Sequence, residues 1–217
     1  SIGVVVFDGD ETRPDEIMKR ADIAMYQAKA AGRNSMALFD PSTLDREAER
    51  YQLINDLREA FDGDQLDLHY QLQVDDARMV IGAEALVRWN HPRFGLVAPD
   101  RFVPLAEQFG MNDELIGFVC RSGLEALAAW QRDPTTSHMR LALNVSAQSF
   151  ASDAFPTLLR KMIEDMGVDA SKLTIELTER VMAKDHEQVA VRLASLKAVG
   201  VGLSLDDFGT GFSSLAY

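Results

Sequence analysis

Four stretches of the chain each place one oxygen-bearing side chain inside an otherwise apolar run: Glu84, Asn144, Glu176 and Asp206. Successive side chains of a β-strand point to opposite faces, so each of these four lies opposite its apolar neighbours. A strand buries a carboxylate only where it is paired, hydrogen-bonded or bound to a metal. Carboxylate and amide oxygens are the ligands that Mg²⁺ and Mn²⁺ prefer. The common phase therefore predicts one divalent-metal site built from neighbouring strands.

A small residue stands two places before each of these side chains, and therefore on the same face: Gly82, Ala142, Thr174 and Ser204. The apolar residues of the four runs occupy the opposite face. The interval from Glu84 to Asn144 is about twice as long as each of the two intervals that follow it. Those two shorter intervals have the length of strand–helix units in a parallel sheet, roughly 30 residues.

Residue patterns predict five strands and four helices in this part of the chain. The strands are expected at residues 66–72, 79–89, 140–145, 173–177 and 202–206. The helices are expected at 99–109, 113–131, 152–166 and 185–199, with a loop at 91–99. The short turn between the first two strands predicts an antiparallel pair. The predicted fold class is α/β, an incomplete (β/α)8 TIM-like barrel of five strands, with catalytic residues at the carboxyl ends of the strands.

The 217 residues are 47% hydrophobic and 26% charged, and the net charge of −12 makes the chain acidic. An acidic chain is a poor partner for DNA, RNA or anionic membranes, so an anionic substrate needs a local metal or arginine. Cys120 is the single cysteine, which excludes an internal disulfide and fits a reducing, cytoplasmic compartment. No apolar run approaches the length of a membrane-spanning helix. A longer parent protein could still be membrane-anchored through segments outside this chain.

The stretch Glu84-Ala85-Leu86 resembles the signature of EAL domains, which hydrolyse the bacterial second messenger cyclic di-GMP. Three further motifs of that family follow in order, at residues 144–146 (Asn-Val-Ser), 176–179 (Glu-Leu-Thr-Glu) and 206–211 (Asp-Asp-Phe-Gly-Thr-Gly). Glu-Ala-Leu alone is common, but four ordered motifs are specific. The resemblance covers Leu66 to Tyr217.

The resemblance implies a two-metal phosphodiesterase that converts cyclic di-GMP to linear pGpG. Two ions about 4 Å apart activate a water and neutralise the phosphate, so the implied cofactors are two Mg²⁺ or Mn²⁺. The resemblance assigns metal ligation to Glu84, Asn144, Glu176, Asp206 and Asp207. Among these, Glu84, Asp206 and Asp207 are the implied catalytic residues, with Asp206 bridging the metals and Asp207 reaching the second. Glu179 is implied to hold the loop at 207–211, and Gln71 and Arg88 to contact the substrate.

Each of these residues also has a structural interpretation. An asparagine on a strand is more often a core or capping residue, and Glu179 and Asp207 fit acids at helix N-termini. Arg88 could be an ion-pair partner of Glu84. The glycines at 209–211 are as typical of a turn as of a phosphate loop. No ligand spacing relates the four histidines, which we interpret as structural or surface residues: His69, His91, His138 and His186.

The N-terminal stretch at 1–40 resembles the C-terminal end of a GGDEF domain, the diguanylate cyclase fold. A strand at 2–7 and a helix from Thr12 to Gly32 are expected, and the sequence at 21–34 carries the resemblance. The Gly-Gly-Asp-Glu-Phe motif is absent, so we expect no cyclase activity from this chain. The predicted domains are 1–40 (GGDEF remnant), 41–63 (linker helix) and 64–217 (N-terminal part of an EAL domain).

Three functions compete. The parent protein is a cyclic di-GMP phosphodiesterase, or a non-catalytic receptor for that dinucleotide, or a protein-interaction module. The visible ligand set favours the enzyme. An intact family barrel has three more strands, so we expect this chain alone to be inactive and to form a homo-oligomer through its open sheet edge. Sensory domains are expected in the parent chain.

Overall fold

The computed structural model describes residues 1–7, 13–30, 34–40, 42–178, 181 and 186–206. Contacts divide the chain into two compact units, Ser1–Asn55 and Asp56–Tyr217. Helix α2, Ser42–Asp62, runs through the boundary between them. None of the helices in the described ranges is long and apolar enough to cross a membrane.

The first unit contains two short parallel strands and a helix packed on them. These elements are β1 (Ile2–Val4), α1 (Pro14–Ala30) and β2 (Met36–Leu38), followed by the start of α2. Gly3 lies so close to α1 that an added Cβ would stand 2.2 Å from the Ala21 carbonyl oxygen. The first strand is shorter than predicted, and the three-residue β2 was not predicted because so short a run carries no periodic pattern. Thr12 and Gly32, the expected helix limits, lie outside the described residues.

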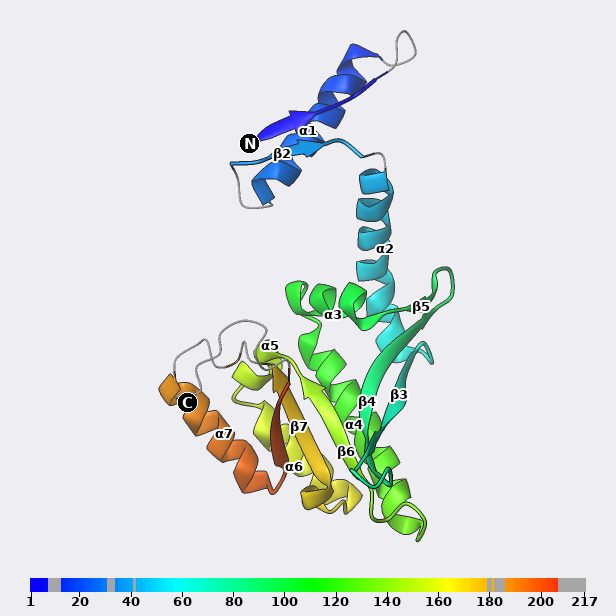
Figure 1. Cartoon of the computed structure of the whole chain (residues 1–217), viewed down its shortest axis with the longest axis vertical. Coiled ribbons are helices and arrows are strands. Elements are labelled where there is room, and N and C mark those ends of the chain that lie inside the picture. The colour runs from blue at the N-terminus through cyan, green and yellow to red at the C-terminus, as the bar shows by residue number, and fades with distance from the viewer. Residues whose placement is uncertain (8–12, 31–33, 41, 179–180, 182–185, 207–217) are drawn as a thin grey trace. The chain divides into compact units, whose positions relative to one another are not determined.

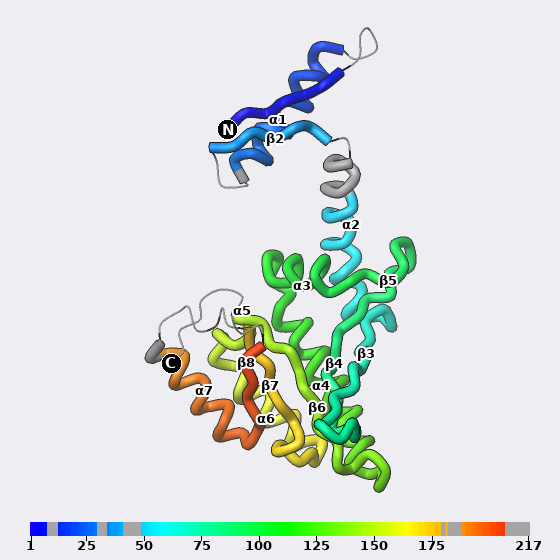
Figure 2. The backbone as a smooth tube through the Cα atoms, viewed as in Figure 1, coloured from blue at the N-terminus to red at the C-terminus, as the bar shows by residue number. Residues whose placement is uncertain are grey.

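The second unit is built on one sheet whose five main strands follow the order β3-β4-β6-β7-β8 (Figure 1). The strands are β3 (Leu66–Val74), β4 (Val80–His91), β5 (Gly95–Val97), β6 (Arg140–Val145), β7 (Leu173–Thr178) and β8 (Gly202–Asp206). β3 and β5 are antiparallel to β4, and the other pairs are parallel. Figure 2 shows successive strands side by side as the colour passes from green to red. The five predicted strands are confirmed, and the architecture is part of an α/β barrel.

Helices connect the parallel strands along one face of this sheet (Figure 1). They are α3 (Pro99–Gln108), α4 (Asn112–Arg132), α5 (Ala147–Ala151), α6 (Phe155–Met166) and α7 (His186–Val199), with a 3₁₀ turn at Ala170–Lys172. The apolar face predicted from strand phase is buried in the first three parallel strands: Ala83, Ala85, Leu141, Leu143, Val145, Leu173, Ile175 and Leu177. Burial of this face is the main favourable term that holds the sheet and helices together.

Gly82 allows β4 and β6 to approach closely at the start of their parallel pairing. An added Cβ there would lie 2.5 Å from the carbonyl oxygen of Arg140, its partner in the register. Real Cβ atoms do not come so close to a backbone oxygen, so a larger residue would push the strands apart. Two positions later on the same face is Glu84, which makes this glycine part of the frame that places the carboxylate.

Two segments differ from the sequence-based expectation. The predicted loop at 91–99 contains β5, which forms a hairpin with the end of β4, and Gly95 adopts φ +67° in the turn. The helix expected at 152–166 is confirmed as α6, but a separate short helix that was not predicted, α5, precedes it, and the Ser146 side chain caps α5 by accepting a hydrogen bond from the Ser149 amide. Such side-chain caps are local hydrogen bonds that hydrophobic periodicity does not report.

Candidate functional site

The four predicted metal ligands lie on four successive parallel strands of one sheet. Asn144 and Glu176 are register partners on β6 and β7, and Asp206 ends β8 opposite Thr178. Glu84 lies on β4 opposite Ala142, two residues before the level of Asn144. Glu84 and Glu176 are partly exposed, and the other two are exposed. These four side chains therefore lie on the face of the sheet that the helices do not cover.

A hydrogen bond connects two of these side chains, and electrostatic repulsion couples three of them. The Asn144 Nδ2 group donates a hydrogen bond of 2.6 Å to Glu84 Oε1. Burial raises the pKa of the Glu176 carboxyl above its ordinary value, and the negative charges of Glu84 and Asp206 raise it further. Three carboxylates thus share one electrostatic neighbourhood, where like charges oppose one another. A divalent cation would relieve that repulsion.

The chemistry of this donor set fits Mg²⁺ or Mn²⁺, because it consists of carboxylate and amide oxygens alone. As the side chains stand, no three Asp, Glu, His or Cys residues within the described ranges are arranged to hold a metal ion. In this arrangement Glu84 Oε1 accepts the hydrogen bond from the Asn144 amide. Binding a metal would require that hydrogen bond to open and the Asn144 amide to turn its oxygen toward the ion.

The two predicted substrate contacts come from the antiparallel part of the sheet. Gln71 on β3 is the direct register partner of Glu84, and its side chain is exposed beside the carboxylates. Arg88 lies on β4 four residues after Glu84, and its Nη1 donates to the Val87 carbonyl at 2.9 Å. The alternative that Arg88 pairs with Glu84 is not what the structure shows, because no such ion pair forms among the described residues. Glu179, Asp207 and the glycines at 209–211 lie outside the described residues.

A cavity of about 790 Å³ opens at the ends of the strands, and of the three carboxylates Asp206 alone is among its lining residues. Asn144, Thr178 and Asp206 line it from the strand ends, and α3 and α4 contribute apolar walls such as Val103 and Leu115. Pockets of this size, mostly apolar with a few convergent polar groups, are typical of small-molecule sites. The arrangement can hold an anionic ligand only if a cation or an arginine offsets the acidic rim.

A buried polar cluster, which sequence reasoning missed, supports the wall of the cavity. The Asn112 side chain at the start of α4 donates to Ser149 Oγ at 2.8 Å, and Ser146 Oγ donates to Asn112 Oδ1 at 3.1 Å. Asn112 is 5% exposed and Ser149 is 2% exposed. The cluster ties α4 and α5 to the residue that follows β6, two positions after Asn144. Only the Asn-Val-Ser stretch pointed toward this region, and nothing in the pattern indicated Asn112.

Comparison with known families identifies the class of the chain. The sequence pattern of the family described as EAL domain matches residues 54–217, and that of the diguanylate cyclase GGDEF domain matches residues 1–35. The chain therefore belongs to the EAL domain family and carries the C-terminal segment of a GGDEF domain in front of it. This is a signalling domain homologous to cyclic di-GMP phosphodiesterases.

Two relatives come from Pseudomonas aeruginosa. The chain is 39% identical to the bifunctional diguanylate cyclase/cyclic di-GMP phosphodiesterase MucR over 218 residues, and 39% identical to the cyclic di-GMP phosphodiesterase NbdA over 219 residues. All of the chain aligns in both cases, but it spans only 32% of MucR and 28% of NbdA.

Solved structures agree with the fold. The phosphodiesterase of P. aeruginosa MucR in complex with c-di-GMP superposes with a TM-score of 0.73 at 39% identity, over 76% of this chain and 67% of that one. The EAL enzyme Bd1971 bound to cAMP and cyclic di-GMP gives 0.72 at 27% identity, over 95% of this chain and 54% of that one. The resemblance of the sequence to EAL domains is thus confirmed.

Proposed function

We propose that the protein containing this chain hydrolyses cyclic di-GMP to linear pGpG with the help of two Mg²⁺ or Mn²⁺ ions. The observation that carries the proposal is the electrostatic coupling of Glu84, Glu176 and Asp206, next to a cavity of about 790 Å³ that Asn144 and Asp206 line. An acidic cluster beside a pocket repels a phosphodiester unless metal ions neutralise it. The relatives MucR and NbdA, which carry phosphodiesterase names, support the choice of substrate.

The proposal gives each residue a role. Glu84, Asn144, Glu176 and Asp206 would hold the first metal, and Asp206 and Asp207 would hold the second. When bound, the metals supply a nucleophilic water near neutral pH and a Lewis acid for the phosphate. Glu179 supports the loop at 207–211.

Gln71 and Arg88 orient the dinucleotide from the antiparallel side of the sheet. The Arg88 guanidinium matches a phosphate bidentately once it releases the Val87 carbonyl. The apolar walls from α3 and α4 are suited to the face of a base. In this proposal the dinucleotide extends from the metal site into the cavity and toward Arg88.

The domain division 1–40, 41–63 and 64–217 belongs to the same proposal, as do a cytoplasmic location, sensory domains elsewhere in the parent protein and a homo-oligomeric state. Light scattering tests the last point, since a monodisperse species of 24.1 kDa would contradict it for this chain.

The test is turnover of cyclic di-GMP by the whole gene product with Mg²⁺ or Mn²⁺, followed by chromatography of the product. Wild-type protein is expected to release pGpG, and Glu84→Gln to lose at least a hundredfold in kcat/KM while Glu125→Gln, an exposed change on α4, keeps it. Tight binding without product would establish the receptor instead. If the protein shows no binding and no turnover of cyclic di-GMP, both the enzyme and the receptor hypotheses are refuted. The chain described here, tested alone in the same assay, is expected to give no product.

A further inference from the structure

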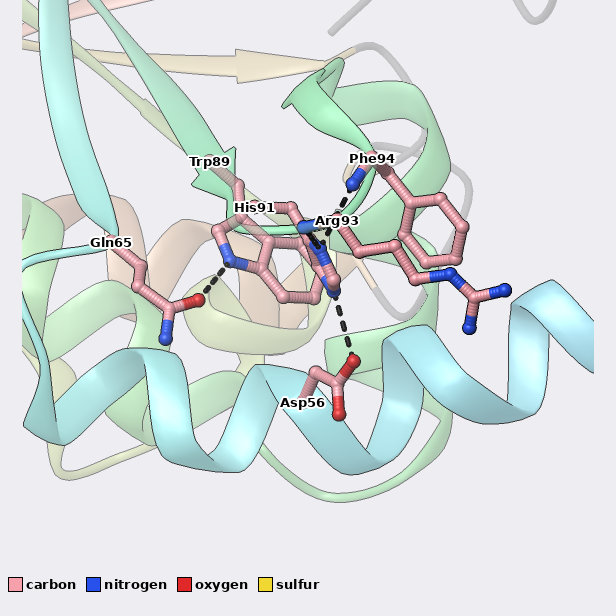
Figure 3. Close-up of polar contacts among 6 residues, drawn as sticks. All are labelled: Asp56, Gln65, Trp89, His91, Arg93 and Phe94. Atoms are coloured by element: carbon pink, nitrogen blue, oxygen red, sulfur yellow. Dashed lines mark hydrogen bonds and ion pairs between the residues drawn. The ribbon is translucent and has the colours of Figure 1, made fainter.

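His91 ends β4 and is enclosed by contacts from three sides (Figure 3). Its side chain is 1% exposed, and its ring packs against Trp89 and Phe94 at centroid distances of 4.9 and 4.6 Å. The Nε2 atom lies 3.0 Å from Oδ2 of Asp56, a residue of α2. The ring is deeply buried and has a carboxylate from another element at hydrogen-bond distance. Its surroundings therefore fix its position and orientation.

The hydrogen bonds fix which ring nitrogen carries the proton. The backbone amides of Arg93 and Phe94 both donate to Nδ1, at 3.0 and 3.2 Å. A nitrogen that accepts two N–H bonds carries no hydrogen, so the proton of the neutral ring is on Nε2 and is donated to Asp56. His91 thus connects α2 to the turn that follows β4 through opposite edges of one ring.

β4 carries this connection toward the site. The strand is continuous from Val80 to His91, and Arg88 lies three residues before the histidine. Between them, Trp89 is fully buried, and its Nε1 donates to Gln65 Oε1 at 3.1 Å. The side chains of Trp89 and His91 therefore hold the end of β4 immediately after Arg88, beyond the point where β4 leaves its ladder with β6.

We propose that Asp56 and His91 are positioning residues: Asp56 orients the His91 ring, the ring holds the turn at 91–94, and the turn fixes the end of β4 so that Arg88 meets the dinucleotide. This inference rests on the proposed function. It adds a requirement that the site includes a carboxylate from α2 that touches neither metal nor substrate. Residues that orient a metal ligand cost about 10-fold to 100-fold when removed, and we expect an effect at the lower end of that range for a pair that orients a substrate contact.

The test compares three changes in the whole gene product. Asp56→Ala removes the acceptor of the Nε2 proton, Asp56→Asn keeps an acceptor oxygen without the charge, and Glu59→Ala removes an exposed carboxylate from the same helix. Asp56→Ala is expected to raise KM for cyclic di-GMP about tenfold with kcat unchanged, the pattern of lost ground-state binding. Asp56→Asn is expected to restore KM to within about twofold, and Glu59→Ala to leave it unchanged.

A fourth variant separates the role of the ring from that of the turn. In His91→Asn, the shorter side chain still offers an oxygen to the amides of residues 93 and 94, as asparagine does in turns, but it cannot reach Asp56. The same rise in KM is expected. In parallel, ¹⁵N NMR of the wild-type histidines is expected to show one ring with its proton on Nε2 and slow exchange with water, and Asp56→Ala to abolish that protection.

The outcomes separate the two proposals. Loss of the protected Nε2 proton with an unchanged KM would make the pair structural only and overturn the inference. A rise in KM in Glu59→Ala, or failure of Asp56→Asn to rescue, would overturn it as well, as would a proton on Nδ1. If wild-type protein binds the dinucleotide without turnover, the proposed enzyme fails, and the inference is then judged by the dissociation constants of the same variants. If wild-type protein does not bind at all, both fail, although the protected proton would remain.

Discussion

Glu176→Gln should stabilise the metal-free second unit. Burial and the charges of Glu84 and Asp206 raise the pKa of the Glu176 carboxyl. A raised folded pKa means that the ionised carboxylate destabilises the folded state at neutral pH. The group is partly exposed, so solvent screens the repulsion, and a partly exposed charge contact contributes about 0.2–1 kcal/mol. Glutamine removes that penalty at similar volume, so we expect a gain of about 0.5 kcal/mol at pH 7.

The sign of the pH dependence follows from the same shift. The penalty of wild-type Glu176 is fully present above the raised folded pKa and absent below the ordinary value of about 4.3. The stability difference between Glu176→Gln and wild type should therefore shrink as the pH falls from 7 toward 4. Divalent metal should act in the opposite sense, stabilising wild type by about 2.7 kcal/mol at 100 times its dissociation constant and the variant by less.

Urea unfolding followed by tryptophan fluorescence measures this, because Trp89 and Trp130 both lie in the second unit. Glu125→Gln, which removes an exposed carboxylate from the middle of α4, is the matched control and should change neither the stability nor its metal dependence. The reasoning would be refuted if Glu176→Gln were less stable than wild type without metal. It would also be refuted if Mg²⁺ stabilised the variant as much as it stabilises wild type. Either result would mean that the three carboxylates do not share a site.

Three further changes test the frame of the site. Gly82→Ala should destabilise the second unit by about 1–3 kcal/mol through overpacking against β6. Gly117 is a helical glycine of α4 with open space around it, so Gly117→Ala should stabilise the same unit by about 0.5–1 kcal/mol. Urea unfolding measures both changes. Asn112→Ala should destabilise the same unit by about 1–3 kcal/mol because buried Ser149 loses its donor, and an unchanged urea midpoint would contradict that role. Burial raises the pKa of Cys120 to about 12, so the thiol should resist alkylation at pH 8 until urea unfolds the protein, and stability should decline above about pH 9, the ordinary thiol range.

Strand phase was sufficient to predict the sheet and which face of it carries the polar side chains. The alternation in runs such as 141–145 and 173–177 is a direct consequence of burial on one face, and burial is what the sheet needs to be stable. The order of strands followed from the even spacing of the later motifs, since a parallel neighbour needs a long crossover connection. These features depend on many residues at once, so one atypical residue does not hide them.

The contacts that orient the site could not be predicted in the same way. The Asp56–His91 contact joins residues 35 positions apart, and the Asn112–Ser149 contact joins residues 37 apart. Each depends on how two elements pack rather than on the pattern within either one. His91 had no ligand spacing, and its interpretation as a structural residue agrees with its burial but says nothing of its partner. The hairpin strand β5 was hidden for a related reason, because three residues are too few to show a period.

Arg88 shows how phase and position differ on a strand. It shares the phase of Glu84, which made an ion pair a reasonable alternative, but four residues of strand separate their Cα atoms by about 13 Å. On a helix the same spacing would bring the two side chains together. β4 is 12 residues long and pairs with β6 only from Gly82 to Ala85, so Glu84 pairs with both β3 and β6, whereas Arg88 pairs with β3 beyond the parallel ladder. For the proposed function, we therefore expect Arg88 to contact a part of the dinucleotide other than the phosphate at the carboxylates, and to leave the Val87 carbonyl when it does so.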